Sequence, residues 1–277
     1  MSIGYDVIIL AGQSNAVGFG DGKTENPFIQ NPDIYEISDT YEMKFFQDEN
    51  GESKLDLRFP PAKDQLYFGI AKELFAYDRN NANLANSFAQ EYVKRGYLKP
   101  GRRLLIVKAA VGGTGFSKGH WVVDGGILNT RMYYLMDEAF KLSEDMKIVA
   151  FLWHQGEHDA FENAHFDAET REKFYEDNFG KFIKALREAY KEHSFPIIAG
   201  EFTEYWMNEN RTACDAVLSA MRRILARDGY GAVVSSAGLK SNSEDHEGTS
   251  DVLHFSRDAL MEFGVRYFKK YEELISK

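Results

Sequence analysis

Short apolar runs alternate along the chain with longer segments in which apolar residues recur at helical spacing. The runs are nearly continuous, as is typical of parallel strands covered on both faces. They occupy residues 7–11, 104–107, 148–152, 195–199 and 232–234. The segments with helical spacing, which predict amphipathic helices, occupy residues 86–95, 130–142, 169–192, 210–227 and 257–275. This alternation predicts an α/β fold in which a parallel sheet lies between helices on both faces.

Residues 19–68 interrupt the alternation. They are rich in Asn, Asp, Pro and Gly, and Tyr41, Met43 and Phe45 alternate with polar residues before a turn sequence at residues 48–51. This pattern predicts an edge strand and a hairpin. Because long irregular segments in compact domains are often functional, we expect an insertion packed over the carboxyl edge of the sheet. It holds too few apolar residues for a core of its own, so we predict one domain over residues 1–277.

The composition narrows the classes of partner. The chain has a formal net charge of −10, and its acidic residues are spread along it. This charge disfavours nucleic acids and anionic membranes, because phosphate contacts need clustered Lys and Arg. No apolar run approaches the roughly 20 residues of a membrane helix, and no leader sequence is visible, so we expect a cytoplasmic protein. Nothing in the sequence predicts an oligomeric state.

Ser14 directly follows the first predicted strand and a turn that begins at Gly12. In open α/β sheets, ligands bind outside the carboxyl ends of the strands. A serine hydroxyl at that position can act as a nucleophile when a base and oxyanion donors reach it. The same residues also suit an ordinary turn, so the other strand ends must decide between the two interpretations.

Two further strand ends carry groups that could stabilise an anion. Gly112 and Gly113 follow the second predicted strand, where glycines allow backbone N–H groups to point at an anion. Their spacing fits neither a P-loop nor a dinucleotide fingerprint. After the third strand, the Gln155 amide could donate to an oxyanion, and Glu157 could accept from a histidine or a substrate hydroxyl.

Histidines follow two of the strand ends. Asp251 lies three residues before His254, where its carboxylate can bond one imidazole nitrogen and leave the other free for a serine. His154 and His158 fit the H-x-x-E-H spacing of an inverted zinc-peptidase motif. That motif needs a helix, which Gly156 and the preceding strand weaken, and a third metal ligand is unassigned. A zinc hydrolase remains an alternative at this point.

Taken together, the segments at residues 12–15, 112–114, 155–159 and 251–256 resemble the SGNH-hydrolase superfamily. More closely they resemble its sialate O-acetylesterase and acetylxylan esterase branch, carbohydrate esterase family six. The resemblance covers nearly the whole chain. It implies a flavodoxin-like three-layer α/β/α sandwich with a central parallel sheet. It also implies hydrolysis of acetyl esters on carbohydrates without a metal or other cofactor.

The resemblance also implies roles for individual residues. Ser14 matches the family nucleophile and His254 the general base. Asp251 matches the acid of the Asp-x-x-His pair, and Glu157 competes with it for that task. The N–H of Ser14, a glycine N–H and the Gln155 side chain match the oxyanion hole. The glycine N–H belongs to either Gly112 or Gly113.

The substrate side is less determined. We expect Asn15, Trp121 and Trp206 to contact substrate, although edge packing would explain the tryptophans equally well. Acetylated xylo-oligosaccharides, sialic acid and similar glycans all remain open. A catalytically inactive carbohydrate-binding protein of the same fold is the main alternative, and a hydrolase of lipid or thioester acyl groups is a further one.

Overall fold

The computed structural model describes residues 3–20, 22, 28–47, 49, 53–59, 66–76, 79–162 and 165–277. All five predicted apolar runs form strands, which are parallel neighbours in the central sheet. These strands are β1 (Gly4–Gly12), β8 (Arg102–Ala110), β9 (Met146–His154), β10 (Ile197–Gly200) and β11 (Gly231–Val234). Within the described ranges the sheet has seven strands in the order β11-β10-β9-β1-β8-β2-β5. The predicted parallel sheet is therefore confirmed, with additional strands on one side.

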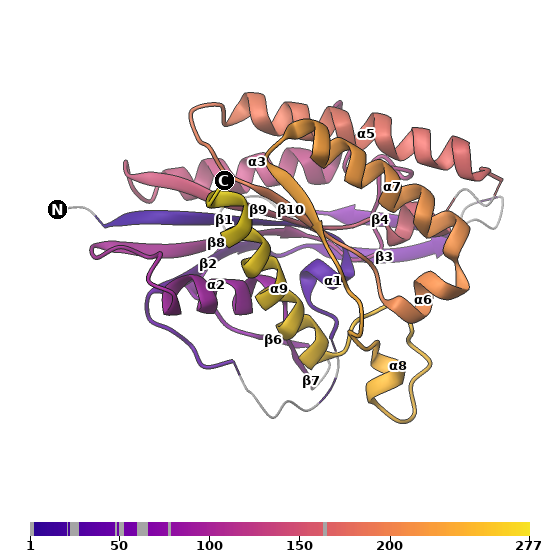
Figure 1. Ribbon diagram of the computed structural model, residues 1–277, viewed down its shortest axis with the longest axis horizontal. Helices are drawn as coiled ribbons and strands as arrows, with labels where there is room; N and C mark the ends of the chain where they lie inside the picture. The colour runs from indigo at the N-terminus through magenta and orange to yellow at the C-terminus, as the bar shows by residue number, and fades with distance from the viewer. Residues whose placement is uncertain are drawn as a thin grey trace.

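Helices cover both faces of this sheet (Figure 1). One core contains residues of α3 (Ile127–Phe140), α5 (Ala168–Ala189) and α7 (Arg211–Asp228). A second core, on the opposite face, contains residues of α2 (Leu84–Lys94) and α9 (Arg257–Ile275). All five predicted helices are thus present, with ends shifted by at most three residues. The arrangement confirms a flavodoxin-like three-layer α/β/α sandwich.

The interval of residues 19–68 differs from the expected insertion. Two of its segments, β2 (Ile34–Asp39) and β5 (Leu66–Ile70), belong to the central sheet, with β2 parallel to β8 and β5 antiparallel at the edge. The pattern hid β2 because it contains Glu36, which is only 2% exposed. Glu36 is neutralised by Lys108 on β8, and no local pattern shows an ion pair between strands.

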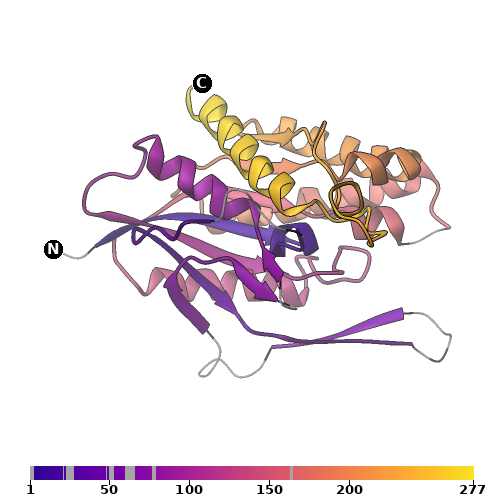
Figure 2. The ribbon, with the colours of Figure 1, turned by 90° about the horizontal axis from the view of Figure 1, so that it is seen from below.

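A hairpin does form in this interval, as the alternation predicted. It consists of β3 (Glu42–Gln47) paired with β4 (Ser53–Arg58) in antiparallel register. Its predicted turn at residues 48–51 lies outside the described residues except for Glu49. Figure 2 shows this hairpin, in purple, extending outside the central sheet. The interval therefore contributes both to the sheet and to an arm beside it.

Short elements cluster where the parallel strands end. The helices are α1 (Ser14–Val17), α4 (Glu157–Phe161), α6 (Glu204–Glu209) and α8 (Asn242–Asp245), and β6 (Leu74–Ala76) pairs with β7 (Arg79–Asn81). Figure 1 shows α6 and α8 on the side of the molecule away from the N-terminus, with α1 nearer the middle. None of these helices was predicted, because four to six residues are too few to show a helical period.

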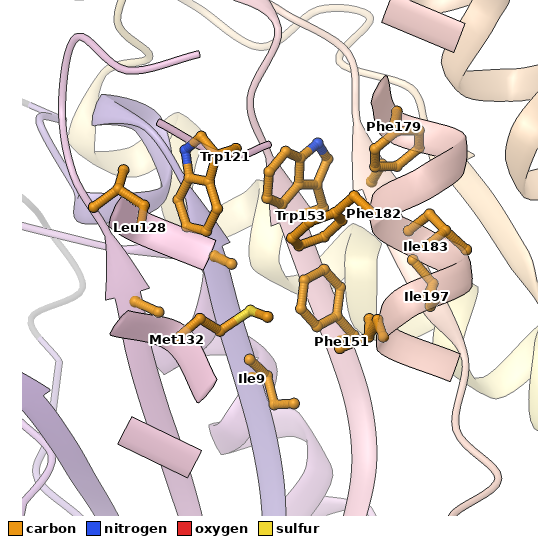
Figure 3. Packing of buried hydrophobic residues seen from close by; sticks show 14 of the residues in the cluster. Ile9, Trp121, Leu128, Met132, Phe151, Trp153, Phe179, Phe182, Ile183 and Ile197 are labelled. Carbon is orange, nitrogen blue, oxygen red and sulfur yellow. The ribbon is translucent and has the colours of Figure 1, made fainter. Parts of the chain in front are cut away.

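Aromatic residues fill the core between the sheet and α5 (Figure 3). The Trp153 ring centroid lies 5.1 Å from that of Trp121 and 5.0 Å from that of Phe182. Trp121 and Trp153 are both fully buried. Large aromatic side chains contribute most of the apolar area of such a core, so the high aromatic content of the sequence is largely structural.

No helix in the described part of the chain combines the length and apolar character needed to cross a membrane.

Candidate active site

The end of β1 delivers Ser14 through a turn that requires glycine. Gly12 has a φ of +139°, and a Cβ there would lie 2.0 Å from the carbonyl oxygen of His154. The N–H of Gln13 then donates to that carbonyl at 2.9 Å. Ser14 follows as the first residue of α1, where backbone N–H groups have no partner within the helix. The turn therefore places both the Ser14 hydroxyl and unpaired N–H groups at the carboxyl edge of the sheet.

A cavity of about 430 Å³ opens at this edge. Its walls come from segments that follow β1, β8, β9 and β10, from β3, and from the loop before α9. The lining residues are Gln13, Ser14, Phe19, Met43, Gly112, Gly113, Glu157, His158, Phe161, Trp206, Leu253 and His254. The structure thus brings the expected nucleophile, base and glycines together in a cavity of the size that small-molecule sites have.

Asp251 holds His254 in a defined orientation. Its Oδ2 lies 2.8 Å from His254 Nδ1, and its Oδ1 accepts from the backbone N–H of His254 at 3.1 Å. Burial raises the pKa of Asp251. The bonds and charge of His254, together with the bond from Asn242, outweigh burial and bring the pKa to about 2. An ionised Asp251 keeps the Nδ1 proton in place, so Nε2 remains the nitrogen available to accept a proton.

The His254 ring faces the cavity beside Ser14. Phe19 stacks on this ring with centroids 5.5 Å apart. Within the described part of the chain, no hydrogen bond joins Ser14 to His254, although both line the same cavity. Catalytic hydrogen bonds are often long in unliganded enzymes and tighten when substrate binds.

Glu157 has a different set of partners. Its carboxylate is fully buried, and its Oε1 bonds His154 Nε2 at 3.1 Å and the Asn15 amide at 2.8 Å. Burial alone would raise the pKa of Glu157, but the charge and bond of His154 and the bond from Asn15 hold it below its usual value. No hydrogen bond joins Glu157 to His254. Of these two carboxylates, Asp251 is therefore the one that contacts the His254 ring.

Gln155 is held away from the cavity. It is fully buried, and its Nε2 donates to Asp159 Oδ2 at 2.6 Å and to the carbonyl of Thr114 at 3.3 Å. Its Oε1 accepts from the Tyr175 hydroxyl at 3.1 Å. The predicted oxyanion donor is therefore joined to the loop after β8, and it is not among the residues that line the cavity.

The glycine loop after β8 approaches the serine closely. A Cβ on Gly112 would lie 3.6 Å from the Cβ of Ser14, and Gly113 has a φ of +69°. The N–H of Val111 donates to the carbonyl of Gly12 at 3.1 Å, which ties the two turns together. This approach brings backbone groups of both turns to one wall of the cavity.

Asp159 holds the far end of this loop, a role that the sequence did not suggest. Its carboxylate accepts from the N–H groups of Phe116 at 3.0 Å and Ser117 at 2.7 Å. The sequence signal was present in the polar run after β9, but it did not show which loop Asp159 would reach.

The structure places the three residues expected to contact substrate in different surroundings. Trp206 lines the cavity. Trp121 does not, because its ring is in the core and its Nε1 donates to Thr114 Oγ1 at 3.2 Å. Asn15 is also fully buried, and its amide bonds other parts of the protein. The sequence did not single out Phe19, Met43 or Phe161 as wall residues, although the interval of residues 19–68, which contains the first two, was expected over this edge of the sheet.

The geometry does not favour the zinc alternative. Both ring nitrogens of His154 already have partners, the Tyr267 hydroxyl at 3.2 Å and Glu157 at 3.1 Å. Among the described residues there is no group of three or more His, Cys, Asp or Glu side chains that could hold a metal ion. The ring nitrogens of His154 are therefore occupied by protein partners, whereas His158 lines the cavity.

The fold and the position of the cavity agree with the resemblance to the SGNH hydrolases. Residues 4–273 match the model of a family described as carbohydrate esterase, sialic acid-specific acetylesterase. The chain belongs to this family and is therefore a carbohydrate esterase.

Solved structures show the same fold at low sequence identity. NanS is 18% identical with a TM-score of 0.72, over 100% of this chain and 99% of that one. A protein from Arabidopsis thaliana is 21% identical with a TM-score of 0.66, over 98% of each chain. A carbohydrate acetylesterase from Xanthomonas citri is 13% identical with a TM-score of 0.56, over 97% of this chain and 56% of that one. A search of curated proteins found no match.

Proposed function

We propose that this protein is a serine esterase that removes O-acetyl groups from carbohydrates through an acetyl-serine intermediate. The observation that carries the proposal is the shared cavity of Ser14 and His254, in which His254 is bonded at 2.8 Å to an ionised Asp251. A serine, a histidine with one free ring nitrogen and an orienting carboxylate are the parts that acyl transfer needs. The whole chain, built on one sheet, is proposed as a single catalytic domain.

The first half of the reaction forms the acetyl-enzyme. His254 Nε2 takes the proton of the Ser14 hydroxyl as Oγ attacks the acetyl carbonyl carbon. The carbonyl oxygen becomes an oxyanion, which the N–H of Ser14 and that of Gly112 or Gly113 stabilise. The bond to the sugar oxygen then breaks, and His254 gives its proton to that oxygen as the alcohol leaves.

The second half releases acetate. A water molecule gives a proton to His254 as its oxygen attacks the acetyl carbon of Ser14. The second tetrahedral intermediate breaks the bond to Oγ, which recovers the proton from His254. Because Gln155 Nε2 donates to Asp159, we assign the oxyanion contacts to backbone N–H groups. Gln155 has a supporting place beside the loop that carries them.

The cavity walls support a carbohydrate substrate. Phe19, Met43, Trp206 and Leu253 give it apolar surface, against which the acetyl methyl and the C–H face of a sugar ring can pack. Phe161 also lines the cavity and is 73% exposed. An aromatic ring that is this exposed at the cavity rim suits a sugar next to the acetylated one.

The test is acetate release by the purified protein from a panel of acetylated sugars and from an aryl acetate. The panel contains acetylated xylo-oligosaccharides and O-acetylated sialic acids, and each substrate is also given to Ser14→Ala. We expect release by the wild type and its loss in Ser14→Ala, while Ser235→Ala, at an exposed serine, retains it. Wild-type turnover by Ser14→Ala would refute the mechanism. Saturable sugar binding without acetate release would identify a binding protein instead.

A further inference from the structure

Asn15 directly follows the proposed nucleophile, but its side chain does not line the cavity. It lies in α1 and is 0% exposed. Its amide bonds two distant parts of the chain, residue 157 and residues 253–255. A buried amide with this many partners holds segments of the chain together, so we expect Asn15 to act through the residues that it positions.

The two ends of the Asn15 amide bracket the proposed general base. Its Nδ2 donates to the carbonyl of Leu253 at 3.2 Å, and its Oδ1 accepts from the N–H of Phe255 at 3.1 Å. These are the residues immediately before and after His254. The amide therefore bonds the backbone on both sides of His254, with one donor and one acceptor, in the way that a neighbouring β-strand would.

Glu157 anchors the amide from the other side. Asn15 Nδ2 donates to Glu157 Oε1 at 2.8 Å, and the same oxygen lies 3.1 Å from His154 Nε2. Hydrogen bonds to an ionised acceptor are stronger than neutral ones. The anchor is therefore a charged group fixed in the core between β9 and α4.

His154 is held at both ring nitrogens. Its Nδ1 lies 3.2 Å from the Tyr267 hydroxyl, which also donates to the carbonyl of Trp153 at 3.0 Å. Its Nε2 lies 3.1 Å from Glu157 Oε1. Through Tyr267, α9 therefore supports the pair of His154 and Glu157.

We propose that Asn15 is a positioning residue that keeps His254 in register with Ser14, and that the His154–Glu157 pair is its anchor. The inference rests on the proposed function. Residues 251–253 form no helix or strand. Besides the Asn15 bonds, the Thr203 hydroxyl donates to the carbonyl of Val252, and the backbone N–H groups of Asn242 and Ser243 donate to the carbonyls of His254 and Asp251. The Asn15 bonds join this segment to α1, which carries Ser14. Because displacement of a catalytic group by about 1 Å can cost on the order of a hundredfold in rate, we expect loss of the Asn15 bonds to lower turnover.

The chemistry of the site requires an amide at position 15. Alanine would remove both bonds to the His254 loop and would leave Glu157 with one partner fewer. Aspartate is nearly isosteric and keeps the acceptor for Phe255. It loses the donor to Leu253 and faces the carboxylate of Glu157. Asn15→Asp therefore breaks the positioning with little change in volume.

The test measures turnover of Asn15→Ala and Asn15→Asp on an aryl acetate and on an acetylated sugar. We expect kcat to fall by about 10- to 100-fold for both substrates alike, with KM within about twofold of the wild type. The concentration of active sites, titrated with a serine-reactive phosphonate, corrects for misfolded protein. The buried Asn129, on α3 and outside the cavity lining, supplies a control in which Asn129→Ala lowers the melting temperature and leaves kcat per active site unchanged.

A rescue experiment separates positioning from simple packing. In Asn15→Asp combined with Glu157→Gln, the new amide can donate to the new carboxylate, which reverses the direction of the bond. We expect the double variant to regain part of the kcat that Asn15→Asp loses. Displacement of His254 in Asn15→Asp should also slow the reaction of Ser14 with the phosphonate. In the double variant we expect this rate to recover together with kcat.

Each other outcome overturns one statement. A raised KM for the sugar alone would make Asn15 a substrate-binding residue. A normal kcat per active site in both Asn15 variants would make it structural, and the positioning role would be wrong while Ser14→Ala still tests the function. Wild-type turnover by Ser14→Ala would instead refute the proposed function, and the role of Asn15 with it.

Discussion

The two edges of the central sheet carry cavities of similar size and different chemistry. At the carboxyl edge lies the cavity of about 430 Å³ that contains Ser14 and His254. At the opposite edge lies a cavity of about 500 Å³ lined by residues that include Asp6, Tyr92 and Arg102. Both contain titratable groups, so size and composition alone do not distinguish them.

The polar groups at the opposite edge bond one another. Asp6 accepts from the Tyr92 hydroxyl and from Arg102 Nε, each at 2.7 Å. The other two guanidinium nitrogens of Arg102 donate to Asp145 and to the carbonyl of Tyr5, each at 2.6 Å. Burial, with the Asp6 bond and charge, raises the pKa of Tyr92 above its usual value, which keeps it a neutral donor.

At the carboxyl edge, hydrogen bonds orient the proposed catalytic side chains but leave the atoms that would react without a hydrogen bond from any described residue. Asp251 fixes one nitrogen of His254. In the described part of the chain neither Ser14 Oγ nor the other nitrogen of His254 has a hydrogen-bond partner. The proposed catalytic edge thus orients groups whose reactive atoms stay available, whereas at the opposite edge Asp6, Tyr92 and Arg102 use their polar atoms to bond one another and their neighbours.

Removal of Ser14 or His254 should have the largest effect. Ser14→Ala and His254→Ala each remove a reacting group, and we expect kcat on an aryl acetate to fall by about 10⁴-fold or more. Tyr92→Phe at the opposite edge is the control and should keep wild-type turnover. If Tyr92→Phe lost activity to a similar degree, the contrast between the two edges would be wrong.

The next largest effect should separate the two carboxylates. Asp251→Asn should lower kcat by about 10³- to 10⁴-fold, because it favours the wrong tautomer of His254. Glu157→Gln keeps an acceptor for Asn15 and should lose less. Because the pKa of Asp251 is near 2, its carboxylate stays ionised from pH 8 down to pH 4. The loss of kcat in Asp251→Asn should therefore be the same throughout that range. A greater loss in Glu157→Gln would reverse the assignment of the orienting acid.

A change at the opposite edge should affect stability and spare activity. Arg102→Ala leaves the carboxylate of Asp6, which is 3% exposed, without its cationic partner. Loss of one member of a buried ion pair typically costs about 3–5 kcal/mol. We expect the free energy of unfolding in urea to fall by that order, with kcat unchanged for the folded fraction. A fall in kcat with unchanged stability would contradict a purely structural edge.

Acid should destabilise the carboxyl edge through His120. Burial, with smaller contributions from His158 and Lys118, lowers the pKa of His120 to about 4. The unfolded chain, with a pKa near 6.5, binds this proton first as pH falls, so stability decreases between about pH 6.5 and pH 4. The contribution from pH 7 to pH 5 is about 2 kcal/mol.

Denaturation at pH 7 and pH 5 tests this assignment. His120→Asn removes the titrating group, so its loss of unfolding free energy between the two pH values should be smaller. Equal slopes in His120→Asn and the wild type would place the acid sensitivity elsewhere.

The smallest expected effect lies at the rim. Phe161→Ala should raise KM for an acetylated oligosaccharide by about three- to tenfold, because aromatic packing contributes about 1 kcal/mol, and should leave KM for an aryl acetate unchanged. Tyr205 is the matched control, since it is 44% exposed and does not line the cavity. An equal rise of KM in Tyr205→Ala would show a general surface effect.

Much of the fold was predictable because its signals are local. Continuous apolar runs predicted five strands, and helical spacing predicted five helices. The strand β2 was missed because it contains Glu36, whose burial depends on an ion pair with Lys108. Lys108 lies 72 residues further along the chain, so no local pattern shows the pair. The short helices at the carboxyl edge were missed because they are stabilised by the turns around them rather than by a periodic apolar face.

The sequence by itself determined which residues could do chemistry and in which order they follow the strands. It also determined the Asp251–His254 pair, since three residues of separation within one turn suffice for that bond. Only the tertiary structure decided where Asn15, Trp121 and Gln155 point. Their partners lie up to 240 residues away along the chain. Which way a buried polar or aromatic side chain turns depends on which donors, acceptors and rings the folded layers bring to it.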